Sequence, residues 1–386
     1  MLILVINCGS SSVKYELFGE NRDSDLFSLE NRSLSLFSGS VERIGEKGSS
    51  CKNHYEAVGV IRKRLFAPDK KRIIRKVDDI KGIGHRIVHG GEEFSKATEI
   101  TRGVLKSIAR SSKLAPLHNP SALEGIKACA RYFRGIRQVA VFDTAFHQSL
   151  PAYAYLYGIP FSFYKKYKIR KYGFHGTSHR FVASEAAKKL GKSLTKLKII
   201  TVHLGNGCSM AAISGGKSID TTMGFTPLEG LLMGTRTGDM DPAIVTFLME
   251  KEGLSVNEMN EVMNNKSGLL GLSGVSNDMR DIARAAKKGN KRAHTAFKIF
   301  VYRIKKYIGA YAAVLGGLDG VVFTGGIGEN MPEIKKTLAA NLRPLLGNKV
   351  KFLTIPTNEE LLIARDTYKL IKKTKTREYK NAKSKT

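Results

Sequence analysis

The chain has 386 residues, of which 42% are hydrophobic and 25% are charged. This length suits two domains better than a single core, and the composition fits a globular α/β protein. The sequence holds no run of 18 apolar residues, and it starts in a strand-like segment without the basic region and cleavage site of a signal peptide. We therefore expect a globular protein without a membrane partner.

The net charge is +30, from 64 Lys and Arg against 34 Asp and Glu. A charge of this size raises nucleic acid or an anionic membrane as a partner. The alternative is a compositional bias spread over solvated helix faces. Basic residues are scattered, apart from residues 62–76 and a basic tail at 369–386, and no RNA-binding motif or zinc spacing accompanies them. We expect no specific nucleic-acid partner, only nonspecific adhesion at low salt.

The four cysteines predict a reducing compartment. Cys8 and Cys208 lie in Gly- and Ser-rich turns, where a disulfide would be a hindrance, and Cys51 and Cys129 add no paired metal spacing. Reduced thiols in the cytoplasm are the simplest interpretation.

Two turns in the chain have the composition of phosphate-binding turns. A predicted strand at residues 2–7 breaks at Gly9, passes three serines and resumes as a strand at 13–18. Backbone N–H groups, hydroxyls and the charge of Lys14 suit a phosphate there. A similar strand–turn–strand pattern occupies residues 199–213. One such turn would be weak evidence, but the pair indicates a duplicated fold that closes on one nucleotide.

The remaining pattern alternates strands and helices. We expect extra hairpin strands and loops over 19–56, and a domain seam near Leu150–Pro151. The other predicted elements, in chain order, are a strand at 83–91 whose end carries Arg and His, a helix at 101–113, a proline-bounded loop at 114–120, a helix at 121–134, a strand at 138–143 that ends in a carboxylate, a helix at 296–315, a strand at 320–324 with a turn at 325–330, and a final helix at 358–373.

Charged and imidazole side chains follow several of these strands, where open α/β sheets place their ligands. Arg86 and Asp143 each come at the end of a strand, and His175 and Arg236 lie in Gly-rich stretches. Seven of the nine histidines fall in such stretches, at 85, 89, 118, 147, 175, 179 and 203. They lack the helix and adjacent Glu of a zinc site. Together with neighbouring Gly and Arg they indicate an anion-binding cleft.

At these motifs the chain resembles the acetokinase family of short-chain fatty-acid kinases, which includes acetate kinase. The resemblance runs in order from residue 2 to about 367. The matching stretches are Asn7–Lys14, Gly84–Gly91, Leu117–Pro120, Phe142–His147, Tyr172–His179, His203–Gly207, Thr226–Gly230, Arg236 with its Gly-Asp context, Gly325–Asn330 and Pro356–Glu360.

The family implies a duplicated ribonuclease H-like fold of the sugar kinase/actin/Hsp70 type, with a nucleotide cleft between two α/β domains. On this basis residues 1–150 with 358–386 form a first domain completed by the C-terminal helix, and residues 151–357 form a second domain with most nucleotide contacts. A homodimer is also implied. Two features depart from the family: the stretch at 346–352 is short, and the tail is basic.

The resemblance also assigns roles to residues. Arg86 and Arg236 would flank the transferring phosphoryl group and the acceptor, and His175 would stabilise the equatorial oxygens. Asp143 would order water on Mg²⁺ and orient Arg86, which we favour over an acid/base role. Asn7 and Glu359 would help to hold Mg²⁺, with Mn²⁺ as the alternative ion. A small apolar pocket for a methyl group would be formed by Val88, Leu117, Phe174 and Pro227.

On the nucleotide side, Lys14 would touch ATP and two glycine-rich turns would cradle it. The residues implied there are His203, Leu204, Gly205, Asn206 and Gly207, then Asp278, Met279 and Arg280, and finally Gly326, Ile327, Gly328, Glu329 and Asn330. Without the resemblance, Asp278 and Arg280 would be read as a surface pair without function.

The chemistry implied is reversible, Mg²⁺-dependent phosphoryl transfer from ATP to acetate, giving acetyl phosphate and ADP. A carboxylate acceptor, with a pKa near ~4.8, is already ionised at pH 7 and needs no general base. It needs neutralisation of charge and in-line positioning. Propionate kinase of the same family is the alternative. A noncatalytic binding protein is disfavoured, because it has no need for the four residues Arg86, Asp143, His175 and Arg236.

Overall fold

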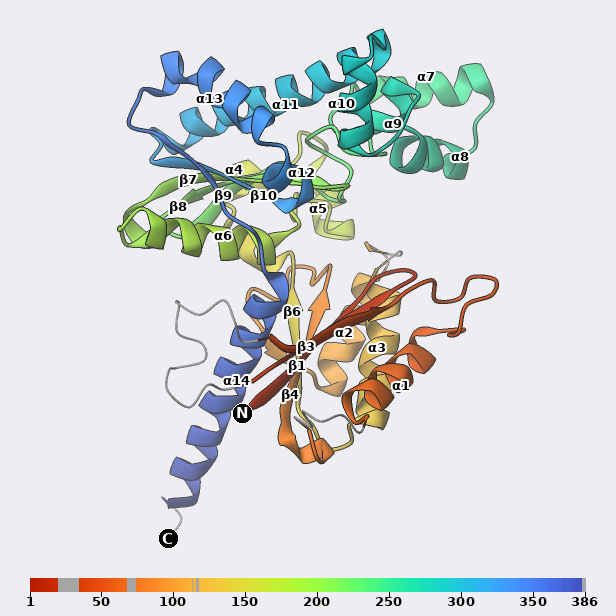
Figure 1. The fold of residues 1–386 in the computed structure, drawn as a ribbon, viewed down its shortest axis with the longest axis vertical. Coiled ribbons are helices and arrows are strands. Elements are labelled where there is room, and N and C mark those ends of the chain that lie inside the picture. The colour runs from red at the N-terminus through yellow and green to blue at the C-terminus, as the bar shows by residue number, and fades with distance from the viewer. Residues whose placement is uncertain (20–34, 68–73, 113, 116–117, 384–386) are drawn as a thin grey trace. The chain divides into compact units, whose positions relative to one another are not determined.

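The structure is a computed structural model that describes residues 1–19, 35–67, 74–112, 114–115 and 118–383, with only the backbone for 374–383. Its contacts divide the chain into two compact units, Met1–Ala145 with Asn358–Thr386, and Phe146–Thr357 (Figure 1). The boundary after Ala145 lies slightly before the seam predicted from the sequence. Within the described part of the chain, no helix has the length and apolar character needed to cross a membrane.

The first unit is built on a six-stranded sheet in the order β3-β2-β1-β4-β6-β5. β2 is antiparallel to β1 and β3, whereas β1, β4 and β6 run parallel. The strands are β1 (Leu2–Cys8), β2 (Val13–Phe18), β3 (Ser35–Val41), β4 (Ile80–Ile87), β5 (Thr98–Glu99) and β6 (Gln138–Phe142), and the helices are α1 (His54–Leu65), α2 (Arg102–Ser111), α3 (Asn119–Tyr132) and α14 (Glu359–Lys383).

The second unit repeats this plan with a five-stranded sheet in the order β11-β10-β7-β8-β9. β8 is antiparallel to β7 and β9, and β7, β10 and β11 are parallel. Its strands are β7 (Lys198–Leu204), β8 (Cys208–Ser214), β9 (Lys217–Thr221), β10 (Gly320–Thr324) and β11 (Lys351–Thr354). The same pairing of a β-hairpin with two parallel strands in both units confirms the predicted duplicated sugar kinase/actin-type fold.

Helices surround the second sheet and account for most of the remaining chain (Figure 1). They are α4 (Ala152–Tyr155), α5 (Phe161–Tyr167), α6 (Gly176–Lys189), α7 (Ala243–Glu252), α8 (Val256–Glu261), α9 (Gly268–Ser273), α10 (Met279–Lys287), α11 (Lys291–Leu315), α12 (Gly325–Asn330) and α13 (Pro332–Leu346). A π-helical turn (Val262–Lys266) follows α8, and 3₁₀ turns cover Val77–Asp79, Ala145–Ser149 and Leu194–Lys196.

Glycines in β4 let the C-terminal helix pack directly on the first sheet. A Cβ atom on Gly82 would lie 2.1 Å from Cδ1 of Ile371, and one on Gly84 would lie 2.5 Å from Oγ1 of Thr367. A larger residue at either position would push α14 off the sheet. This close approach fixes the start of α14 at the end of β4, where Arg86 lies.

Two elements differ from the sequence prediction. The segment 325–330 is a short helix rather than a turn, because the Glu329 carboxylate accepts hydrogen bonds from Gly325 N (2.9 Å) and Thr324 Oγ1 (3.3 Å) and closes the first turn. The final helix continues to Lys383 instead of ending at residue 373. After its apolar stripe ends, its residues are mostly good helix formers without Gly or Pro.

Candidate active site

Arg86 and Asp143 meet at the carboxyl end of the first sheet. β4 and β6 are parallel neighbours in register, with Ile87 opposite Phe142, so the residues around their ends are adjacent. Arg86 donates from Nε to both oxygens of Asp143 (3.2 and 3.1 Å) and from Nη2 to Oδ2 (2.6 Å). The Asp143 carboxylate is only 1% exposed. Both of its oxygens are therefore engaged in holding the guanidinium group.

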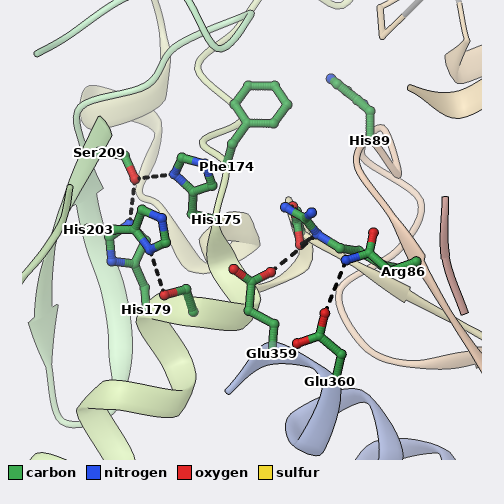
Figure 2. Close-up of polar contacts among 12 residues, drawn as sticks. Arg86, His89, Phe174, His175, His179, His203, Ser209, Glu359 and Glu360 are labelled. Carbon is green, nitrogen blue, oxygen red and sulfur yellow. Dashed lines mark hydrogen bonds and ion pairs between the residues drawn. The ribbon is translucent and has the colours of Figure 1, made fainter. Parts of the chain in front are cut away.

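A second carboxylate reaches Arg86 from the start of α14. Glu359 Oε2 lies 3.3 Å from Arg86 Nε, and Figure 2 shows the Glu359 side chain pointing toward the guanidinium group. Burial alone would disfavour the charged form of Arg86, but the carboxylates of Asp143 and Glu359 outweigh it and raise its pKa. Arg86 thus stays a cation in a fixed orientation.

Oxygen ligands suited to a hard cation lie beside this pair. Asn7 Nδ2 donates to Glu360 Oε1 (3.3 Å), so the end of β1 contacts the start of α14 next to Glu359. Lys14 is directly opposite Asn7 in the hairpin and is exposed. Among the described residues, no group of three or more His, Cys, Asp or Glu is arranged to hold a metal. The donor set fits Mg²⁺, which commonly takes one or two carboxylates and completes its shell with water and phosphate oxygens.

In the second unit, two side chains converge on the β7–β8 turn. His175 is the residue before α6 and has a left-handed backbone, with φ of 54°. A Cβ atom on Gly207 would lie 3.5 Å from His175 Nε2 and 3.6 Å from Arg236 Nη1, so imidazole and guanidinium edges face the same glycine. Arg236 Nη1 also donates to the Pro227 carbonyl (3.2 Å), and burial lowers the pKa of Arg236.

The imidazole of His175 is held by two neighbours. Its Nδ1 lies 2.8 Å from Ser209 Oγ, and its ring stacks on His203 with centroids 4.4 Å apart. His203 Nδ1 in turn lies 2.8 Å from Ser178 Oγ. Two cationic imidazoles stacked in this way would repel each other, so the arrangement suits at most one positive charge on the pair.

Four further buried histidines, His85, His89, His147 and His179, have a lowered pKa. Burial lowers the pKa of each, to about 4 for His85, His89 and His147, and well below its usual range for His179. These rings are neutral at pH 7.

A pocket of about 380 Å³ opens in the second unit beside the strand ends. Eight of the residues expected at the nucleotide line it, namely Gly205, Asn206, Asp278, Met279, Arg280, Gly326, Ile327 and Asn330. Asn277 and Met331 also line it, and the sequence analysis missed both.

Asp278 has a defined role in this wall. It caps α10 by accepting from Arg280 N (2.8 Å), and it pairs with the Arg280 guanidinium through Nε and Nη2. These hydrogen bonds from Arg280, aided by its charge, lower the pKa of Asp278 to about 2. The pair therefore lines a pocket, in addition to capping a helix at the surface.

The other expected nucleotide residues do not line this pocket. His203 stacks on His175, Gly207 faces His175 and Arg236, and Leu204 and Gly328 are buried. The Glu329 carboxylate points to the backbone N–H groups of Gly325 and Thr357 (2.9 and 3.3 Å), so it braces the chain that leads from β10. Lys14 belongs to the first unit.

The residues expected around a methyl group are distributed over both units. Val88 follows β4 and is half-buried, whereas Phe174 is buried and Pro227 is half-buried in the second unit. Leu117 lies outside the described residues. Their grouping into one pocket stays a prediction.

Sequence reasoning also missed Ser209, Glu360 and the hydrogen bonds of His179. The adjacent acidic pair at a predicted helix start was a signal for Glu360. Ser209 gave none, because a serine within an apolar strand resembles any other strand residue.

A family model, sequence relatives and solved structures all point to the same family. The model of the acetokinase family matches residues 2–350. An acetate kinase from Thermoanaerobacterium thermosaccharolyticum is 49% identical, covering 97% of this chain and 100% of the relative. The crystal structure of Porphyromonas gingivalis acetate kinase has a TM-score of 0.88 at 42% identity, covering 96% of this chain and 99% of that one. A propionate kinase from Francisella tularensis has a TM-score of 0.85 at 40% identity, with 95% and 99% covered. The chain therefore belongs to the acetokinase family of kinases.

Proposed function

We propose that this kinase transfers a phosphoryl group reversibly between ATP and acetate, with Mg²⁺, forming acetyl phosphate and ADP. The observation that carries the proposal is the Arg86–Asp143 pair at the sheet end. A guanidinium group locked in one orientation suits a carboxylate or phosphoryl ligand. Propionate is the second candidate substrate, because a propionate kinase is 40% identical to this chain.

The mechanism that fits these residues is charge neutralisation. Acetate is ionised at pH 7, so no base has to remove a proton. Both carboxylate oxygens of Asp143 accept hydrogen bonds from Arg86, so we assign Asp143 the role of positioning Arg86. Arg86 and Arg236 would contact the acceptor and the transferring group, and His175 would donate from Nε2 to an equatorial oxygen. Each such donor is typically worth ~2–4 kcal/mol in the transition state.

Mg²⁺, when bound, would offset phosphate charge and shield it from the attacking anion. Asn7 and Glu359 are its proposed protein contacts, with water and ATP supplying the rest. Because Asn7 now contacts Glu360 and Glu359 contacts Arg86, both side chains would exchange a protein partner for the ion or its waters.

The pocket on the second unit is the proposed site of adenosine. Its volume of about 380 Å³ is within the range of small-ligand sites, and glycine backbone from two turns lines it. Asp278 and Arg280 offer a carboxylate and a guanidinium group at its edge. The phosphates would extend toward Gly207, where His175 and Arg236 converge.

We also propose a homodimer in the cytoplasm. Large apolar side chains are exposed on the second unit, including Tyr153, Phe161, Phe163, Ile244 and Phe247, and such exposure favours a protein partner. Cys8, Cys51, Cys129 and Cys208 are all free and buried, which suits a reducing compartment.

The test is an assay that captures acyl phosphate as its hydroxamate, with ATP, Mg²⁺ and acetate, propionate or butyrate in parallel. We expect the highest kcat/KM with acetate and none without a divalent ion. Arg236→Ala should lower kcat by about 10²–10³-fold while ATP still raises the melting temperature. Absence of hydroxamate with every acid, from a folded protein that binds ATP, would refute the proposal.

A further inference from the structure

Ser209 lies between two imidazole rings of the second unit. Its Oγ is 2.8 Å from His175 Nδ1 and 2.8 Å from His179 Nε2 (Figure 2), and the serine is fully buried on β8. A hydroxyl group has a single proton, so Ser209 can donate to only one of these nitrogens and must accept from the other. The hydrogen bonding of His175 is therefore coupled to that of His179.

His179 is suited to serve as the neutral end of this chain. It is fully buried, and burial, followed by the nearby His147 and His203, keeps its pKa well below the usual range. Its other nitrogen, Nδ1, lies 2.8 Å from the hydroxyl of Thr201. A neutral imidazole has one N–H. If that proton is on Nε2, it is donated to Ser209, and the Thr201 hydroxyl donates to Nδ1.

The far edge of His175 faces the place where chemistry is proposed. Nε2 of His175 would be 3.5 Å from a Cβ atom on Gly207, and Arg236 Nη1 would be 3.6 Å from the same atom. A neutral His175 can donate a hydrogen bond from Nε2 only as the tautomer with its single proton on Nε2, in which Nδ1 is an acceptor. In this structure the Ser209 hydroxyl is positioned to donate to Nδ1.

We propose that His179 and Ser209 are positioning residues that hold neutral His175 as its Nε2–H tautomer. The hydrogen bonds run from His179 Nε2–H to Ser209 Oγ, and from Ser209 O–H to His175 Nδ1. The proton of His175 then remains on Nε2, aimed at the Gly207 turn. This inference rests on the proposed role of His175 in phosphoryl transfer, and it adds the two residues that make His175 a hydrogen-bond donor at neutral pH.

The direct test reads the tautomer by NMR of full-length protein labelled with ¹⁵N-histidine, with His175 assigned from the signals lost in His175→Ala. We expect the wild-type spectrum to show a proton on Nε2 and none on Nδ1. Ser209→Ala should give a mixture of both tautomers. The control is Ser218→Ala, which removes another buried serine–histidine hydrogen bond, 2.8 Å from Ser218 Oγ to His147 Nδ1. It should leave the His175 signals unchanged.

Kinetics supply a second readout, which a structural role alone would not produce. At about pH 8, Ser209→Ala should lower kcat by about 3- to 10-fold, with the KM values for acetate and ATP within about twofold. At about pH 5.5 the deficit should shrink, because a protonated His175 has a hydrogen on both nitrogens. Among the described residues, the titratable or charged groups near His175 include His203, His179 and Arg236, and all remain in the variant.

A conservative replacement of His179 distinguishes the loss of its hydrogen-bond donor from the loss of its packing. His179→Gln can place an amide N–H near the position of Nε2, and should retain more of the kcat than His179→Leu. The proposal is overturned if neutral wild-type His175 carries its proton on Nδ1. It is equally overturned if the loss of kcat in Ser209→Ala is the same at every pH, or if it is no larger than the loss of kcat in Ser218→Ala. The NMR measurement of the tautomer does not require enzyme turnover. If the wild-type protein carries the His175 proton on Nε2 but has no kinase activity, the proposed function is refuted while the tautomer assignment stands.

Discussion

Replacing Asp143 by Asn tests whether this carboxylate acts by holding Arg86. The change removes the charge and turns an amide N–H₂ group toward the guanidinium donors. Breaking a buried ion pair typically costs ~3–5 kcal/mol, because a charge is left without its partner. Asp143 is 1% exposed, but the Arg86 side chain is 22% exposed and keeps Glu359 at 3.3 Å. We therefore expect a smaller loss of unfolding free energy, about 2–3 kcal/mol.

Catalysis should suffer more than stability. A guanidinium group free to rotate no longer offers its donors in one place, and we expect kcat to fall by about 10²–10³-fold. Urea unfolding measures the loss of unfolding free energy, and steady-state kinetics with acyl hydroxamate detection measure the change in kcat.

Glu99→Gln is a matched control in the same unit. Glu99 forms the same two-pronged pair with Arg137, at 2.7 and 2.5 Å, but with side chains 38% and 25% exposed. Exposed pairs contribute about 0–1 kcal/mol, so this variant should be nearly as stable as the wild type and fully active. The reasoning fails if folded Asp143→Asn keeps its kcat, or if the two variants lose kcat equally.

Three further outcomes can be checked. Val88→Ala should shift the kcat/KM ratio toward propionate by at most ~1–3 kcal/mol, and an unmoved acetate-to-propionate ratio would remove Val88 from the acceptor pocket. Deleting residues 375–386 removes five Lys or Arg and one Glu, a net change of four charges. It should leave kcat largely unchanged, because Glu359 is at the other end of α14, and any nucleic-acid binding should vanish in moderate salt with or without the tail. A salt-resistant complex that needs the tail would contradict this. Finally, the lowered histidine pKa values mean that the unfolded chain binds more protons than the folded one between about pH 6.5 and pH 4. Stability should fall as the pH drops through this window, by up to about 1.4 kcal/mol per pH unit for each ring. The melting temperature of His85→Gln against pH should have a shallower slope, because His85 is one of these rings with a pKa near 4.

The sequence predicted the fold where the local pattern was strong. Both β-hairpins show apolar runs interrupted by Gly, Ser or Asn, and β1 and β7 pair with β2 and β8 as those runs suggested. The segment 325–330 was misread because three glycines disfavour a helix. The bond that closes this helix comes from Glu329, whose carboxylate orientation is set by Thr357, a contact far along the chain.

Individual candidate residues could be proposed from the sequence, but the contacts between them could not. Arg86 and Asp143 stood out as charged residues at strand ends, and Glu359 was implied by the family resemblance. The contact of Glu359 with Arg86 depends on how closely α14 approaches β4, which is set by Gly82 and Gly84 and is not visible in either segment alone. The Ser209 hydrogen bonds likewise join β8 to His175 and His179 at the start of α6, and they are not visible in either segment alone.

The duplicated topology explains why these residues lie at helix starts. Among the helices between the two sheets in the chain, α6 packs on β7, β8 and β10 of the second sheet, and α14, which follows the second sheet, packs on β1, β4 and β6 of the first. Each sheet is thus completed by a helix from the other half of the sequence. His175 immediately precedes α6 and Glu359 begins α14, so the same topological position holds a candidate site residue in both halves. A helix start carries partial positive charge, which favours an anion near His175 and the carboxylate of Glu359 in the first turn. Duplication therefore supplied two equivalent positions, and in the proposed mechanism the side chain at one of them, His175, contacts the phosphoryl group while the other, Glu359, contacts its counter-ion.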